Sequence, residues 1–156
     1  MTIHNLHENT AIRQALLAGD LDNANRLLGY DYTVTGTVIE GKKIGSKIGF
    51  PTANILPDAN ELIPANGAYA VEVKTKFGCF PGMLNIGVNP TIDSTNRKIN
   101  IEVHIINFDR DIYNKSISII FKKKLRDEKQ FENIEQLAAQ MKLDKEETIK
   151  LFPFFS

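Results

Sequence analysis

The sequence predicts a mainly β domain, an antiparallel barrel or sandwich, with helices at both ends. Several short segments alternate apolar and polar residues, which is the period of a half-buried strand. Turn residues separate these segments and no helical pattern lies between them, as antiparallel pairing requires. Apolar stripes at helical spacing occur only near the two ends of the chain.

The first thirty residues predict two short helices. Gly19 and Gly29 are placed to end them, and Asp20 can cap the second. The apolar positions of the two stripes are Ile12, Ala15 and Leu16, then Leu21, Ala24, Leu27 and Leu28. Two helices of this size are too small to form a domain, so we interpret residues 1–29 as a helical linker and 30–156 as the folded domain.

The middle of the chain predicts the strands. The alternating segments are 32–38, 68–76, 79–86, 99–108 and 116–121. The apolar residues expected to share a face within them are Tyr32, Val34 and Val38; Tyr69, Val71 and Val73; Ile99, Ile101, Val103 and Ile105; and Ile117, Ile119 and Phe121. Residues at i and i+2 of a strand point to the same side, so these positions predict the core of the sheet.

The end of the chain predicts helix again. Asn133 and Gln136 form a capping-box pattern, which predicts a helix start. Asp144 and Glu147 repeat that pattern and predict a second start. The apolar positions expected to dock are Ile134, Leu137, Ala138 and Met141, followed by Ile149, Leu151 and Phe152.

Composition excludes several classes of function. The chain has 156 residues with a formal net charge of zero, so no long-range positive field would gather nucleic acid. Cys79 is the single cysteine, which excludes an internal disulfide, and three scattered histidines do not give zinc-ligand spacing. No apolar run has the length of a signal peptide or a membrane span. We therefore expect a soluble cytoplasmic protein with no membrane or nucleic-acid partner.

A glycine- and lysine-rich stretch raises the question of phosphate binding. Residues 36–43 read GTVIEGKK, which is close to a P-loop, but Lys43 stands where a hydroxyl should reach magnesium and no helix follows. Glycines that let backbone N–H groups approach an anion alternate with lysines: Gly41, Lys42, Lys43, Gly45, Lys47 and Gly49. Considered alone, a solvated turn between strands is the commoner explanation.

The segment PTAN at 51–54 presents two neutral oxygen donors. Pro51 stiffens the chain, and in an extended segment Thr52 and Asn54 point to the same side. A hydroxyl and an amide carbonyl suit a hard cation such as magnesium that also takes phosphate oxygens and water. By chemistry alone, local hydrogen bonding of the two side chains in a turn is the commoner explanation.

Two further features indicate chemistry. Glu102 lies in the middle of a predicted strand, on the polar side with Asn100 and His104. A strand would hold a general base rigidly, although an exposed polar face explains the residue equally well. The segment LRDEKQF at 125–131 combines cations with an aromatic ring, which suits a planar ligand, or else forms a solvated connector before the last helix.

The order of these motifs is more specific than any one of them. GSKIGFPTANI, NIGVNPTI, IEVHIINFDRDIY and LRDEKQF follow one another as in the riboflavin kinase family, over roughly residues 30–152. The stretch 9–32 also resembles the junction of bacterial bifunctional riboflavin kinase/FAD synthetases, in which an adenylyltransferase domain precedes the kinase. The chain thus resembles the kinase module of a longer enzyme.

The resemblance implies a six-stranded antiparallel Greek-key barrel that transfers a phosphoryl group from ATP to the 5′-hydroxyl of riboflavin, with Mg²⁺ as cofactor. It implies Glu102 as general base and Thr52 and Asn54 as magnesium ligands. The nucleotide would be bordered by Gly41, Lys47, Thr52, Ile105, Asn107 and Tyr113. The flavin would be contacted by Arg126, Lys129 and Phe131.

Two positions depart from the family pattern. Ser46 stands where bacterial members usually have arginine, which leaves Lys47 as the expected cation over the phosphates. Asn114 stands where a glycine is usual, and asparagine tolerates a left-handed backbone better than most residues. Two other functions are compatible with a small barrel: a flavin-binding module without catalysis, and a single-stranded nucleic-acid binder, which zero net charge and the absence of tryptophan disfavour.

Overall fold

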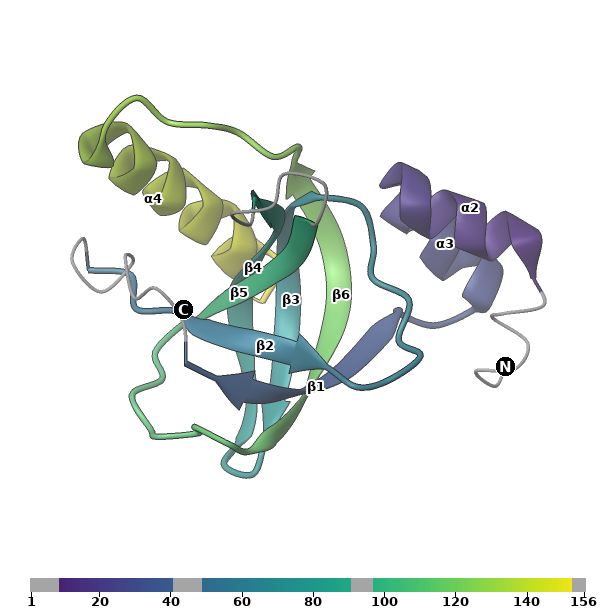
Figure 1. Ribbon diagram of the computed structural model, residues 1–156, viewed down its shortest axis with the longest axis horizontal. Coiled ribbons are helices and arrows are strands. Elements are labelled where there is room, and N and C mark those ends of the chain that lie inside the picture. Colours follow the sequence, from purple (N-terminus) through teal and green to yellow (C-terminus); the bar gives the residue numbers. More distant parts are fainter. Residues whose placement is uncertain (1–8, 41–48, 91–96, 153–156) are drawn as a thin grey trace.

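The computed structural model describes residues 9–40, 49–90 and 97–152, apart from the side chains of 89, 90, 97 and 98. Six antiparallel strands close into a barrel in the order β1-β2-β5-β4-β3-β6 (Figure 1). The strands are β1 (Thr33–Ile39), β2 (Ala53–Pro57), β3 (Gly67–Thr75), β4 (Gly78–Pro90), β5 (Arg97–Ile105) and β6 (Ser116–Arg126), and the helices in the described ranges are α2 (Thr10–Ala18), α3 (Leu21–Leu28) and α4 (Ile134–Lys150).

The strand connections confirm the predicted Greek key. Strands β3, β4 and β5 follow one another as a meander, and β6 returns to pair with β3 rather than with β5. Strand β2 pairs with β5 instead of with its successor β3. This gives the spatial order 6-3-4-5, in which the fourth strand lies beside the first, as in a Greek key.

Inward-facing side chains of all six strands form the core. The alternation along β5 is clear, since Ile101, Val103 and Ile105 are buried while Glu102 between them is only half-buried. The largest fully buried side chains of the barrel are Tyr69, Val71, Val73, Leu84, Ile86, Val103, Ile117, Ile119 and Phe121. Gly36 lets β2 approach β1 closely, because a Cβ there would lie 2.6 Å from the backbone oxygen of Leu56.

The two helical ends of the described chain lie on different sides of the barrel (Figure 1). Helices α2 and α3 share one apolar cluster with the barrel, and Asn25 fixes the join by donating to the Phe121 carbonyl at 3.0 Å and accepting from the Tyr32 amide at 2.8 Å. The predicted ends of these helices are confirmed. Gly19 and Gly29 have φ of 80° and 82°, and the Asp20 side chain accepts from the Asn23 amide.

Several predicted element bounds were wrong. The strand β2 was missed, because its five residues, ANILP, are too short and too mixed to show alternation. Strand β6 continues past residue 121 as far as Arg126, because its later residues still pair with β3. Strand β5 stops at Ile105, since Asn107 has a φ of 56° that ends the extended chain. Ile99, predicted for the core, is 56% exposed near the end of the barrel.

The last helix also differs from the prediction. Asn133 caps α4 through the Gln136 amide, as predicted, but the helix then runs unbroken to Lys150. Asp144 is therefore an interior residue of α4 and not a cap. Ile134 is 51% exposed and does not dock, whereas Asp144 and Thr148 are the buried residues of this helix.

His104 of β5 positions the chain that leads into β2. Its Nδ1 lies 2.7 Å from the carbonyl oxygen of Pro51, and since a carbonyl only accepts, Nδ1 carries the hydrogen. The ring also meets Phe50 edge-on, with ring centroids 5.5 Å apart. These contacts fix the backbone one residue before Thr52.

Burial makes the stability of the protein depend on His104 protonation. Desolvation lowers the pKa of His104 below its ordinary value of 6.5; the bond to Pro51 opposes this and the charge of Lys145 adds to it. Below about pH 6.5 the unfolded chain therefore binds a proton that the folded chain still excludes. Stability from this group is present at neutral pH and is lost as the pH falls below that value.

We predict that His104→Gln flattens the acid side of the stability profile. The parent should lose up to about 1.4 kcal/mol of unfolding free energy per pH unit below pH 6.5 through this one group. Urea unfolding of both proteins between pH 5 and 7.5 measures the two slopes. Every other titrating group is common to both, so equal slopes would show that His104 has no such effect.

Candidate functional site

One row of residues crosses five strands and forms the base of the candidate site. Asn54 on β2 lies opposite Glu102 on β5, which lies opposite Asn85 on β4. Asn85 lies opposite Ala68 on β3, which lies opposite Arg126 on β6. Side chains directly opposite one another in an antiparallel pair are on the same face. The row therefore presents its polar groups on the outer surface of the barrel.

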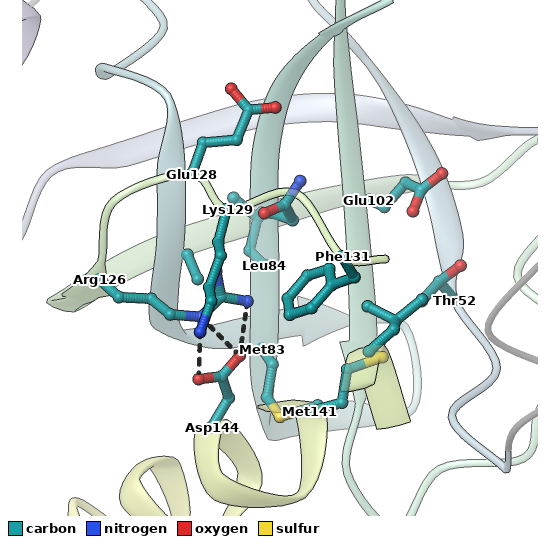
Figure 2. Close-up of a pocket in the computed structure, with 13 residues that line it drawn as sticks. Thr52, Met83, Leu84, Glu102, Arg126, Glu128, Lys129, Phe131, Met141 and Asp144 are labelled. Carbon is teal, nitrogen blue, oxygen red and sulfur yellow. Dashed lines mark hydrogen bonds and ion pairs between the residues drawn. The ribbon is translucent and has the colours of Figure 1, made fainter. Parts of the chain in front are cut away.

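A cavity of about 240 Å³ lies over this row, beneath α4 and the segment that precedes it (Figure 2). We call it the helix pocket. Its lining residues are Thr52, Ala68, Met83, Leu84, Asn85, Glu102, Arg126, Glu128, Lys129, Phe131, Leu137, Met141 and Asp144. In Figure 2, Glu102 and Thr52 are drawn on one side of the pocket and the Arg126–Asp144 pair on the other, with Phe131 between them.

A second cavity, of about 380 Å³, lies beside the first. We call it the loop pocket, since it lies between the start of β2 and the loop that follows β5. Its lining residues are Pro51, Thr52, Ala53, Val103, Ile105, Phe108, Asp109, Arg110 and Ile112. Thr52 lines both cavities. The loop pocket and the helix pocket therefore meet at this residue.

Glu102 has the environment that a proton acceptor needs. Its side chain is half-buried at the wall of the helix pocket. Within the described ranges its carboxylate makes no hydrogen bond and no ion pair. The oxygens are thus available to a ligand, and strands on both sides, β2 and β4, hold the residue in place.

Within the described residues, the side-chain amide nitrogen of Asn54 has a hydrogen-bond partner and its side-chain carbonyl oxygen has none. Its Nδ2 donates to Oδ1 of Asn100 at 2.9 Å. This bond orients the amide so that its own Oδ1 is not used by Asn100. Asn54 lines neither cavity, but its register position places it beside Glu102. No group of three or more His, Cys, Asp or Glu side chains with metal-site geometry occurs in the described part of the chain.

Arg126 is held firmly at the far end of the row. Its Nη2 donates to Oδ2 of Asp144 at 2.9 Å, and its Nε lies 3.2 Å from both carboxylate oxygens. The guanidinium carbon lies 5.8 Å from the centroid of the Phe131 ring, and Nζ of Lys129 lies at the same distance from that ring. The three residues predicted to contact a planar ligand therefore form one cluster.

The structure brings some of the predicted site residues together and not others. Thr52, Glu102, Arg126, Lys129 and Phe131 share the helix pocket, and Ile105 lines the loop pocket with Thr52. Asn107 and the 47% exposed Tyr113 line neither pocket, although they flank residues that do. Gly41, Ser46 and Lys47 lie outside the described residues. Asn114 has a φ of 65°, as its place in the left-handed turn predicted.

Sequence reasoning missed several pocket residues. Asn85 opens the motif NIGVNPTI, but its role became visible only through its register with Glu102. Met83 and Met141 line the pocket from β4 and α4, and isolated methionines carry no sequence signal. Asp144 did carry one, because it stands three residues after Met141 on the face of a helix expected to be apolar.

Comparison with known proteins supports the resemblance to riboflavin kinases that the sequence motifs indicate. The family model for riboflavin kinase, or flavokinase, matches residues 28–152. The bifunctional riboflavin kinase/FMN adenylyltransferase of Listeria monocytogenes is 42% identical over 92% of this chain and 46% of its own length. The protein of the same name from Bacillus subtilis is 39% identical over 90% of this chain and 45% of its own. The chain thus spans about half the length of the curated relatives that it matches.

Solved structures share the fold. A chain described as a macrolide-efflux protein from Streptococcus pneumoniae superposes with a TM-score of 0.84 and 35% identity, over 90% of this chain and 45% of that one. Riboflavin kinase from Trypanosoma brucei superposes with a TM-score of 0.51 and 21% identity, over 78% and 79% of the two chains, which indicates the fold alone. In residues 9–40, 49–90 and 97–152, no helix is both long and apolar enough to cross a membrane.

The order of the sequence motifs, the Greek-key barrel and the family match over most of the chain lead to one conclusion. The chain belongs to the riboflavin kinase family.

Proposed function

We propose that this chain transfers the γ-phosphoryl group of ATP to the 5′-hydroxyl of riboflavin at the junction of its two pockets, giving FMN and ADP. Riboflavin occupies the helix pocket and the nucleotide occupies the loop pocket. The observation that carries this proposal is that Thr52 lines both cavities while Glu102, whose carboxylate has no partner among the described residues, lines the helix pocket with it. A hydroxyl at this junction would meet both a base and the end of a polyphosphate.

Glu102 serves as the general base in this proposal. Phosphoryl transfer depends mainly on alignment and charge neutralisation, and the base orients the attacking hydroxyl and takes its proton. A carboxylate that has no partner among the described residues can accept that proton directly. Asn54 and Asn85 lie opposite Glu102 on the two neighbouring strands, whose pairing holds the backbone of Glu102 in place.

Thr52 and Asn54 fit a magnesium ion by the chemistry of their donors. The Thr52 hydroxyl and the available Oδ1 of Asn54 are neutral oxygen ligands, which leave room for phosphate oxygens and water. When bound, magnesium would neutralise charge that develops on the transferred phosphoryl group. The hydrogen bond between Pro51 and His104 fixes the backbone beside Thr52, and the bond to Asn100 fixes the amide of Asn54.

The remaining nucleotide contacts follow from the loop pocket and the family motifs. Ile105 supplies apolar surface to that cavity. Asn107 and Tyr113 are proposed to border the nucleotide from the loop that follows β5. Gly41 and Lys47 are proposed to approach its phosphates.

The flavin would lie along the row that leads from Glu102 to Arg126. These residues are three strand spacings apart along the sheet, roughly 14 Å, so an elongated ligand with a planar end can span them. Phe131 offers an aromatic face to the ring system, with Lys129 and Arg126 beside it. Met83, Leu84, Leu137 and Met141 supply the apolar surface that a fused aromatic ring needs.

The wider setting is part of the same proposal. The named relatives are bifunctional and about twice as long as this chain, so we propose an adenylyltransferase domain as a partner in the parent protein. Residues 1–29 would then form a helical linker before the kinase domain at 30–156. The cytoplasmic location expected from the sequence stays a prediction.

A flavin-binding module without catalysis is the main competing function. It would need the Phe131 cluster but would have no use for a free carboxylate beside Thr52. Incubation with riboflavin, ATP and magnesium, followed by chromatography of the flavins, distinguishes the two. Formation of FMN supports the kinase, and riboflavin binding without FMN formation supports the module.

We predict that Glu102→Gln binds both substrates normally but loses turnover by about 10²- to 10⁴-fold, the usual contribution of a general base. Steady-state FMN formation and riboflavin binding measure the two quantities. Glu128→Gln is the matched control, because it removes another carboxylate from the same cavity. Turnover by Glu102→Gln within a few-fold of the parent would remove Glu102 from the base role.

We predict that Asn54→Ala raises the magnesium concentration needed for half-maximal activity by about tenfold or more, since it removes a ligand oxygen. Asn100→Ala is the control, because it breaks the hydrogen bond to Asn54 but leaves the Asn54 carbonyl oxygen. If both variants shift the magnesium titration equally, Asn54 acts only through that hydrogen bond.

A further inference from the structure

The face that α4 turns toward the barrel is polar at its centre. The buried residues of this helix are Asp144, 6% exposed, and Thr148, fully buried. A surface helix normally docks through an apolar stripe. Here Leu137 and Met141 are only half-buried and Ile134 is exposed. The position of α4 therefore depends on what Asp144 binds.

Both carboxylate oxygens of Asp144 accept hydrogen bonds from Arg126. Arg126 donates to it through Nε and Nη2 in a two-pronged contact, shown by the dashed lines in Figure 2. The side chains of Arg126 and Asp144 are 20% and 9% exposed, so the pair is largely shielded from water. Gln140 adds a further donor, its Nε2 lying 2.9 Å from Oδ1 of Asp144.

This contact changes what Arg126 can offer a ligand. Its Nε and Nη2 are engaged by Asp144, and Nη1 donates to the Asp127 carbonyl at 3.3 Å. All three nitrogens of the guanidinium thus have protein partners. Each nitrogen uses one N–H in these bonds, so one N–H on Nη1, one on Nη2 and the flat face of the group remain for the pocket. The guanidinium carbon lies 5.8 Å from the centroid of the Phe131 ring. A guanidinium held in this way can stack on a planar ligand.

Lys129 differs from Arg126 in this respect. Its ammonium also lies 5.8 Å from the Phe131 ring, but within the described residues it has no carboxylate or carbonyl partner. Its three N–H donors are available to acceptors on a ligand. The two cations of the cluster therefore differ: Asp144 holds the Arg126 guanidinium in one orientation, whereas the Lys129 ammonium keeps its donors for a ligand.

We infer that Asp144 is a positioning residue of the riboflavin site, which fixes the Arg126 guanidinium as a planar wall beside Phe131, while the ammonium of Lys129 donates hydrogen bonds to the flavin carbonyls. This inference rests on the proposed function, since it assumes that riboflavin occupies the helix pocket. It assigns to α4 a part in substrate binding through a residue that need not touch the substrate.

Riboflavin binding in the absence of ATP tests the inference directly. The parent protein and the variants Asp144→Asn and Gln140→Ala are each titrated with riboflavin. The quenching of flavin fluorescence on binding gives the three dissociation constants. Asp144→Asn should weaken riboflavin binding about tenfold, as expected when a charged hydrogen-bonded contact is lost. Gln140→Ala, which removes a different partner of the same carboxylate, should stay within about threefold. In turnover assays Asp144→Asn should raise the KM for riboflavin and leave the KM for ATP unchanged.

A double-mutant cycle tests whether Asp144 acts through Arg126. If Asp144 acts through Arg126, adding Asp144→Asn to Arg126→Met should change the riboflavin dissociation constant less than twofold. An equal loss in both backgrounds would show that Asp144 acts independently of Arg126 and would overturn the inference. A single Asp144→Asn variant that binds like the parent would also overturn the inference.

Arg126→Lys keeps the test decisive if Asp144→Asn fails to fold. Lysine retains a positive charge for Asp144, so α4 should stay docked. It lacks the planar face of arginine and the second hydrogen-bond donor to the Asp144 carboxylate. Weaker riboflavin binding with little change in melting temperature supports the inference, and parent-like binding refutes it.

Failure of the proposed function would be visible separately. A parent protein that binds riboflavin but forms no FMN would refute the kinase, while the binding titrations would still decide the role of Asp144. A parent that does not bind riboflavin would overturn both.

Discussion

The register of β5 against its two neighbours is the constraint on which the candidate site depends. Glu102 lies opposite Asn54 on one side and Asn85 on the other, and the same row continues through Ala68 to Arg126. Because side chains alternate along a strand, a slip of one residue would place Ile101 or Val103 in this row and turn Glu102 into the core. The buried isoleucines and valines of β5 therefore specify the position of the proposed base.

The barrel supplies only one side of the helix pocket. The other side comes from α4 and the segment that leads to it, and these are tied to the row by the contact between Arg126 and Asp144. Removing the charges of Arg126 and Asp144 from water costs free energy. The presence of this ion pair beneath a half-buried helix is therefore weak evidence that it stabilises the fold. Its geometry does specify where the helix lies, and with it the shape of the cavity.

The two pockets divide the proposed reaction between rigid and irregular parts of the chain. Glu102 and Asn54 lie on strands, where neighbouring strands hold them, while Thr52 immediately precedes β2. His104 restrains the irregular segment that contains Thr52, because its hydrogen bond to Pro51 ties that segment to β5. Placing the base on a strand and the ligand-facing aromatic ring on a connector suits a site that must align two substrates and also admit them.

The sequence by itself determined the class of the fold, the Greek-key barrel through its family motifs, and five of the thirteen residues that line the helix pocket. Alternation at Ile101, Val103 and Ile105 was enough to place Glu102 on the opposite face. Such periodic patterns are local, so they can be recognised without knowing the partner strands. Strand β2 was not predicted from alternation, because five residues are too few to show a period.

The tertiary structure decided which residues meet across the barrel. Asn85 joined the site only through its register with Glu102, and Asp144 changed from a helix cap to the partner of Arg126, eighteen positions away in the sequence. Both contacts depend on how strands and a helix pack in space, which no local pattern specifies. The same packing fixed the orientation of the Arg126 guanidinium, a property that belongs to the pair and not to the residue.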